Sequence, residues 1–99
     1  MKGMIKLKWN KVIGYDKNLA YDYQRENKVN LPEIGKLVLI YYHDKFRYND
    51  IPFVGYIKYS DTSLNIYDSE GRSMMLLEYA AEQNLQWAEF DMPERDVNN

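Results

Sequence analysis

The sequence predicts a small α+β domain, with a mainly antiparallel sheet of four or five strands and one or two short helices. Six consecutive apolar or aromatic residues occupy positions 37–42, a run too short for a typical helix and rich in strand-forming types. A second such run, 53–59, follows a polar gap. Because short connections favour neighbouring antiparallel strands, these runs are expected to share one sheet. A small SH3-like barrel is the alternative, since consecutive bent strands with an internal Gly also describe it.

The N-terminal part is expected to supply a first strand and then a short helix. Positions 5–10 alternate apolar residues with Lys and Asn, which is the period-two pattern of a strand with one solvent-facing side. Asp16 or Asn18 is the predicted N-cap of a helix that extends to about Lys28. This segment is polar and equally fits a loop. Pro32 ends it, because a proline favours extended geometry in the preceding residue.

The middle of the chain predicts three strands joined by turns. The loop 43–52 separates the first two runs, and Gly55 inside the second run indicates a bulge or a close approach of two backbones. A third strand is predicted at 64–67. The segment Asp68–Gly71 then fits a type I turn with Gly71 in the left-handed region, as in a three-residue hairpin loop.

The segment 73–84 allows two interpretations. Residues spaced three and four apart are apolar, and Glu, Ala and Gln in its second half favour a helix. Either a short strand at 72–75 precedes the helix, or a helix of two to three turns begins directly, with Ser73 as its cap.

Alternation at 85–90 predicts a last strand, which Pro93 closes. Residues 94–99 have no apolar side chain to bury except one Val and are expected to form a disordered tail. The sequence thus predicts a single α+β domain over residues 1–93 and a tail over 94–99.

Composition restricts the function classes. The chain has 99 residues and no Cys, so disulfides, thiolate chemistry and Cys-type zinc sites are excluded. No apolar run approaches the roughly 18 to 20 residues that span a bilayer, and a cytoplasmic location without membrane contact is expected. The ten tyrosines are unusual. Tyr combines a large apolar ring with a polar tip and therefore suits half-buried strands and binding surfaces.

The net charge of −2 hides a strong asymmetry along the chain. Residues 1–17 carry +4, residues 18–60 carry +1 and residues 61–99 carry −7. Such a split can mark an acidic surface that meets a basic partner. It can also mean that the fold brings the two ends together so that their charges neutralise each other.

Several segments resemble the small phage- and prophage-borne proteins of the domain-of-unknown-function 551 type. The resemblance lies in Leu31-Pro32-Glu33-x-Gly35-x-x-Val38-Leu39-x-Tyr41, in Val54-Gly55-Tyr56, and in Trp87 with Met92-Pro93-Glu94. The chain departs from that family at Gln24, where the family has Trp, at Gln86, where it has His, and in keeping only one closing proline. The resemblance implies a mobile-element origin and supplies no catalytic residue.

Enzymatic chemistry is not predicted. His43 is the only histidine, it adjoins Asp44 in a polar loop, and no nucleophile stands in a recognisable context. The five glycines are isolated, so there is no phosphate-binding loop, and the carboxylates lack metal-ligand spacing. No catalytic residue, cofactor or metal is therefore expected.

The leading functional hypothesis is stoichiometric binding to a host protein, with inhibition of a defence or nucleic-acid enzyme that has a basic surface. Tyrosines are common at binding hot spots, and acidic residues complement a basic partner. The candidate residues for this role are Tyr42, Tyr48, Tyr56, Tyr59, Tyr67, Asp68, Glu70 and Glu89. A nucleic-acid-binding module is the first alternative, and its candidate residues are Lys6, Lys8, Trp9 and Lys11. A homodimer that pairs through an open sheet edge is the second alternative.

Overall fold

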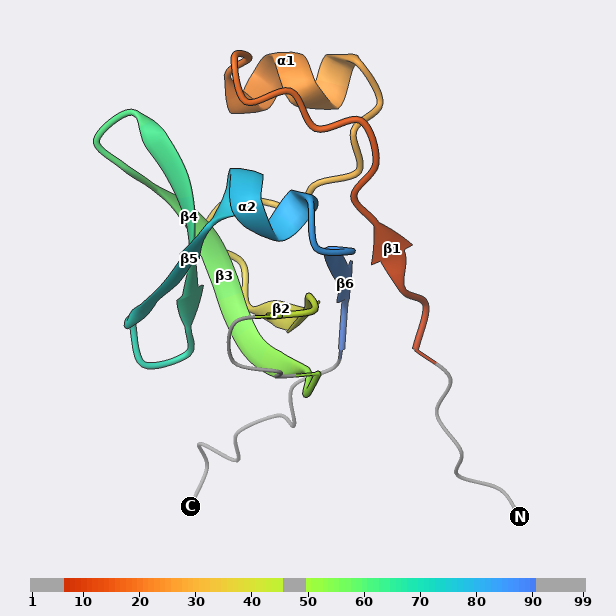
Figure 1. Ribbon diagram of the computed structural model, residues 1–99, viewed down its shortest axis with the longest axis vertical. Coiled ribbons are helices and arrows are strands. Elements are labelled where there is room, and N and C mark those ends of the chain that lie inside the picture. The colour runs from red at the N-terminus through yellow and green to blue at the C-terminus, as the bar shows by residue number, and fades with distance from the viewer. Residues whose placement is uncertain (1–6, 46–49, 91–99) are drawn as a thin grey trace, which may run out of the picture.

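The structure is a computed structural model that describes residues 7–45 and 50–90. Six strands and two short helices lie in this part of the chain (Figure 1). They are β1 (Asn10–Lys11), α1 (Tyr21–Glu26), β2 (Val38–Tyr41), β3 (Phe53–Ser60), β4 (Ser63–Asp68), β5 (Ser73–Leu76), α2 (Leu77–Ala81) and β6 (Gln86–Ala88). The predicted α+β class is confirmed. The sheet has six strands instead of four or five, because the short β5 joins it as well.

All strand pairs are antiparallel, and the strand order in the sheet is β1-β6-β2-β3-β4-β5. From β2 to β5, each strand pairs with the next strand along the chain. Helix α2 then leads the chain back to the opposite end of the sheet, where β6 lies next to β2. β6 inserts between β1 and β2, so Trp87 lies opposite Asn10 on one side and Ile40 on the other. The last strand therefore joins the N-terminal segment to the middle of the sheet.

One face of the sheet forms the hydrophobic core. Residues that lie opposite each other on neighbouring strands point to the same face of the sheet. In the pairs Ile40–Trp87 and Ile57–Ile66, all four side chains are buried. Both helices pack against this face. Leu77 and Ala80 of α2 and Tyr21 of α1 belong to the same core cluster, and Figure 1 shows α2 lying across the strands. The side chains that alternate with the core residues along each strand point to the opposite face of the sheet.

Helix α1 begins later than predicted, and neither Asp16 nor Asn18 caps it. The Asp16 carboxylate accepts a hydrogen bond from the Asn18 backbone N–H at 2.9 Å and so closes a turn before the helix. The N–H of Tyr21 instead donates to the Tyr59 hydroxyl at 2.9 Å. The helix ends at Glu26, before Lys28, which has a left-handed φ of 65°.

The predicted N-terminal strand is reduced to its end. Strand geometry begins only at Asn10, where β1 pairs with β6, and Leu7 to Trp9 form no strand. Residues 5 and 6 lie outside the described residues. β6 is itself only three residues long, so it offers few backbone groups for a longer partner strand.

Both glycine predictions are confirmed. Gly71 has a φ of +89°, and its N–H donates to the Asp68 carbonyl at 3.0 Å, which closes the turn between β4 and β5. At Gly55 two backbones approach closely: a Cβ atom there would overlap the carbonyl oxygen of Tyr67 on β4. This position can be filled only by glycine unless the two strands move apart.

The ambiguous segment 73–84 contains a strand followed by a helix of five residues, and Ser73 caps nothing because the N-cap of α2 is Leu76. The last strand is shorter than the predicted 85–90, since only 86–88 pair. The predicted tail at 94–99 lies outside the described residues, as does Pro93.

Candidate functional site

Tyrosines gather on the sheet face opposite the core. Tyr56 on β3 lies directly opposite Tyr67 on β4, and their rings stack with centroids 5.4 Å apart and planes 14° apart. Tyr41 at the end of β2 has the same outward orientation, because its neighbours in the chain, Ile40 and Tyr42, are both buried in the core. We call the surface formed by Tyr41, Tyr56 and Tyr67 the tyrosine face. All three rings are half-buried, so they are both supported and accessible.

The Asp68 carboxylate holds the turn beside the stacked pair through hydrogen bonds. The Asp68 carboxylate accepts hydrogen bonds from the backbone N–H groups of Glu70 and Arg72, each at 2.9 Å, and from Arg72 Nε at 2.8 Å. These bonds and the Arg72 charge lower the pKa of Asp68, with the bond from the Arg72 backbone as the largest cause. Arg72 also contacts Glu70 at 3.0 Å. The turn is therefore fixed at the edge of the tyrosine face.

A second polar group lies at the other end of the tyrosine face. The Tyr41 hydroxyl donates to Asp50 Oδ1 at 3.3 Å, and His43 Nδ1 lies 2.5 Å from the same oxygen. The bond to His43 lowers the pKa of Asp50, while burial raises the pKa of Tyr41. Tyr41 therefore stays a hydrogen-bond donor and is oriented by Asp50.

Two lysines share the tyrosine face. Lys58 follows the same alternation as Tyr56 on β3, and Lys11 on β1 pairs with Gln86, which lies opposite Tyr41 across β6 and β2. Both lysines are exposed. The face therefore combines aromatic rings with two basic side chains, although the chain as a whole is acidic.

The structure corrects the prediction for Tyr42. Its side chain is only 7% exposed, belongs to the core cluster and packs edge-on against Phe53 with centroids 5.9 Å apart. Tyr59 also lies on the core side, where its hydroxyl binds the start of α1. Neither ring is part of the tyrosine face.

The other candidate residues are dispersed. Asp68 and Glu70 form the charged turn described above, whereas Glu89 is bound to Lys36 at 2.8 Å, away from the stacked pair. Lys8 is exposed and Trp9 is half-buried, and both precede β1. Tyr48 and Lys6 lie outside the described residues.

Sequence reasoning missed two features. The first is the outward position of Tyr41, because 37–42 is apolar throughout and shows no alternation that separates inside from outside. The second is Gln24, a fully buried amide in α1. A polar residue in a polar segment gives no sign of burial, so only its hydrogen bonds in the fold reveal it.

Within residues 7–45 and 50–90, no group of three or more His, Cys, Asp or Glu residues is arranged to hold a metal ion. No helix in the same part of the chain is both long and apolar enough to cross a bilayer.

Comparison with known proteins found no matching family model, no matching curated protein and no matching solved structure. The resemblance to the domain-of-unknown-function 551 type therefore stays a prediction.

Proposed function

We propose that this chain is a small binding module that docks a partner protein on its tyrosine face and acts by stoichiometric binding without catalysis. The stacked pair Tyr56–Tyr67 carries this proposal. Two large rings stand side by side on a sheet face, and both described helices pack against the opposite face. Aromatic side chains of this kind dominate the binding energy of protein interfaces.

The arrangement of these rings also favours tight binding. Each ring supports the other, and both are attached to neighbouring strands of a six-stranded sheet. Side chains that are already ordered lose less conformational entropy when a partner binds. The tyrosine face is thus prepared for contact before the partner arrives.

Charges around the tyrosine face favour a partner surface that carries both positive and negative groups. Glu70 and Arg72 project from the turn with 73% and 72% of their side chains exposed, and Lys58 lies beside Tyr56. Rim charges of this kind guide encounter and orientation more than they add affinity. A host protein remains the proposed partner class, with inhibition by covering its working surface as the mode of action.

The test is affinity capture from a lysate of the source cells with matched tyrosine variants. The wild type should retain a specific protein, and Tyr56→Thr and Tyr67→Thr should each weaken that binding by about 30-fold or more, since both rings act as hot spots. Thr keeps strand propensity, so the sheet is retained.

Tyr23→Ala and Tyr79→Ala are the controls, because both tyrosines are exposed but lie on the helices. Equal loss of binding in these controls would assign the partner to another surface. Undiminished binding by both Thr variants would contradict the proposal.

Binding of single-stranded nucleic acid is the second candidate, favoured by Lys11 and Lys58 on the same face as the rings. Bases stack on aromatic side chains, and lysines contact phosphates. Fluorescence anisotropy with a labelled oligothymidylate should then show affinity that falls steeply as salt rises, and Lys58→Gln should weaken it. Absence of binding at low salt excludes this candidate.

A further inference from the structure

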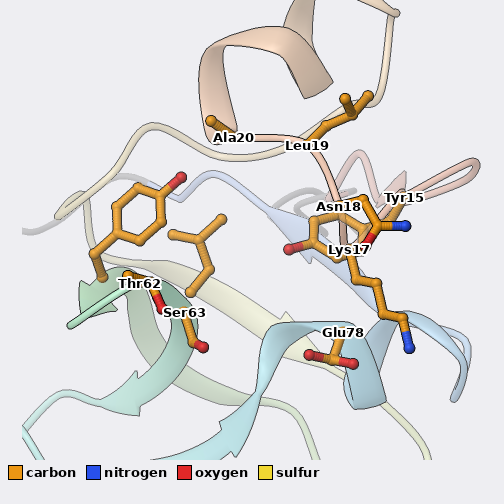
Figure 2. A pocket seen from close by; sticks show the side chains of 10 residues that line it. Tyr15, Lys17, Asn18, Leu19, Ala20, Thr62, Ser63 and Glu78 are labelled. Carbon is orange, nitrogen blue, oxygen red and sulfur yellow. The ribbon is translucent and has the colours of Figure 1, made fainter.

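A pocket of about 260 Å³ opens on the core side of the sheet, away from the tyrosine face. Three parts of the chain form it: the loop before α1, the hairpin between β3 and β4, and α2 (Figure 2). We call it the Tyr15 pocket. The polar residues that line it are Tyr15, Lys17, Asn18, Tyr59, Thr62, Ser63 and Glu78.

The loop that forms one wall is held in place by a buried amide. Gln24 has no exposed surface, accepts a hydrogen bond from the Asp16 N–H at 3.1 Å, and donates to the carbonyls of Leu19, at 3.0 Å, and Asp16. One side chain thus fixes both ends of the segment 16–19. A rigid wall of this kind keeps the pocket open without a ligand.

The opposite wall is fixed through Tyr59. Its hydroxyl accepts the hydrogen bond from the Tyr21 N–H, which leaves the hydroxyl hydrogen able to donate. Figure 2 shows the oxygen atoms of Tyr15, Thr62, Ser63 and Glu78 around the same hollow. The polar lining therefore combines hydroxyl and carboxylate oxygens with the ammonium of Lys17 and the amide of Asn18.

The Tyr15 hydroxyl is partly desolvated and lies near negatively charged groups. Burial raises the pKa of Tyr15 most, and the nearby Tyr59, Glu78 and Asp16 raise it further. Lys17 also lines the pocket, so the lining carries one formal positive charge and one formal negative charge.

Glu78 is the one carboxylate among the residues that line the pocket, and it shares that lining with Lys17. Among the described residues, Asp50, Asp68, Glu70 and Glu89 each contact a basic side chain. No such contact joins Glu78 to Lys17 within ion-pair distance in this part of the chain, although both line the pocket. The half-buried Glu78 carboxylate is thus available to a ligand that brings its own positive charge.

We propose that the Tyr15 pocket binds a primary ammonium group carried on a short alkyl chain. An ammonium has three donors and no acceptor, which matches hydroxyl and carboxylate oxygens. The faces of Tyr15 and Tyr59 add cation–π attraction, and Leu19, Ala20 and Leu64 can contact the alkyl part. The pocket is slightly smaller than sites that hold drug-sized ligands, so a small amine fits its size.

The direct experiment is a titration of the full chain with n-butylammonium chloride, followed by ¹H–¹⁵N NMR. Saturable shifts are expected at residues 15–20, 59–64 and 78. n-Butanol, which has the same alkyl chain but no charge, should cause no saturable shift there. Sodium chloride at matched ionic strength controls for screening.

Two substitutions test the assigned chemistry. Glu78→Gln keeps the shape of the side chain and removes its charge, so it should weaken butylammonium binding about tenfold or more. Ser63→Ala removes one acceptor and should cause a smaller loss. Glu70→Gln is the matched control in the charged turn and should bind like the wild type. An unchanged affinity in Glu78→Gln, or shifts outside the pocket, would overturn the proposal.

The ammonium could belong to a free amine or to a lysine side chain of another protein. Nα-acetyl-lysine-methylamide carries the same ammonium with a peptide backbone attached. Tighter binding of this compound than of butylammonium identifies a protein lysine as the ligand, and the reverse order identifies a free amine. Failure of both to bind at millimolar concentration would refute the site.

Discussion

The tyrosine face and the Tyr15 pocket lie on opposite sides of the same sheet and are built in different ways. In the tyrosine face, the rings of Tyr56 and Tyr67 stack on each other. The Tyr15 pocket is a hollow, and one of its walls is the loop that Gln24 holds by hydrogen bonds. Strand register brings the two stacked rings together, whereas a wall of the pocket is held by the hydrogen bonds of a buried polar side chain.

The consequence is that the two surfaces should respond to different substitutions. A change in the β3–β4 register should disturb the tyrosine face, and a change in the loop before α1 should disturb the Tyr15 pocket.

Gly55→Ala is expected to have the largest effect. A Cβ atom at this position overlaps the Tyr67 carbonyl oxygen and forces β3 and β4 apart, so the free energy of unfolding should fall by about 3 kcal/mol or more. Urea denaturation measures this loss. Gly14→Ala is the matched control: its φ of +82° is unfavourable, but no atom lies within 4 Å, and a loss of about 1 kcal/mol is expected. Equal losses would contradict the close approach at Gly55.

Gln24→Ala should have an intermediate effect that is confined to the pocket side. It removes the acceptor of the Asp16 N–H and the donor to Leu19, which should reduce the free energy of unfolding by about 2 kcal/mol. Hydrogen exchange should show the amides of 16–19 losing protection before those of β3 and β4. Gln83→Ala, just after α2, is the control and should change the free energy of unfolding by less than about 0.5 kcal/mol.

The stacked pair should show a smaller, pairwise effect. A double-mutant cycle of Tyr56→Thr and Tyr67→Thr should give a coupling energy of about 1 kcal/mol, as expected for stacked aromatic rings. Urea denaturation of the two single variants and the double variant provides the cycle. Additive effects would mean that the rings do not support each other.

The smallest effect concerns the charged turn. Because Arg72 and two backbone N–H groups lower the pKa of Asp68, the folded state holds its proton less tightly than the unfolded state. The stabilisation from Asp68 is therefore fully present above its ordinary pKa of about 3.8 and is lost as the pH falls through the lowered folded value. In Arg72→Gln, NMR titration should find the pKa of Asp68 closer to its ordinary value. An unchanged pKa would mean that the Arg72 side chain does not lower it.

Much of the sheet could be predicted from the sequence, because its signals are local. The runs at 37–42 and 53–59, the turn at 68–71 and the close approach at Gly55 all depend on residues near one another in the chain. Each of these features appears where predicted, within one or two residues of the predicted bounds.

The parts that could not be predicted depend on contacts between distant residues. Tyr41 and Tyr42 are identical in type and adjacent, and only the pairing of β2 with β3 and β6 decides which one faces the core. Helix α1 is likewise placed by Tyr59, which is 38 residues away in the chain. Gln24 gives no signal of burial until the loop that it binds is folded.

Docking on the tyrosine face is tested most directly by mapping the partner onto the chain. Hydrogen–deuterium exchange of the chain, alone and with the protein that it captures, reports which backbone amides the partner protects. Docking on the tyrosine face predicts protection in β2, β3 and β4 around Tyr41, Tyr56 and Tyr67, with 15–20 and α2 unchanged. Protection confined to 15–20 and α2 would contradict it.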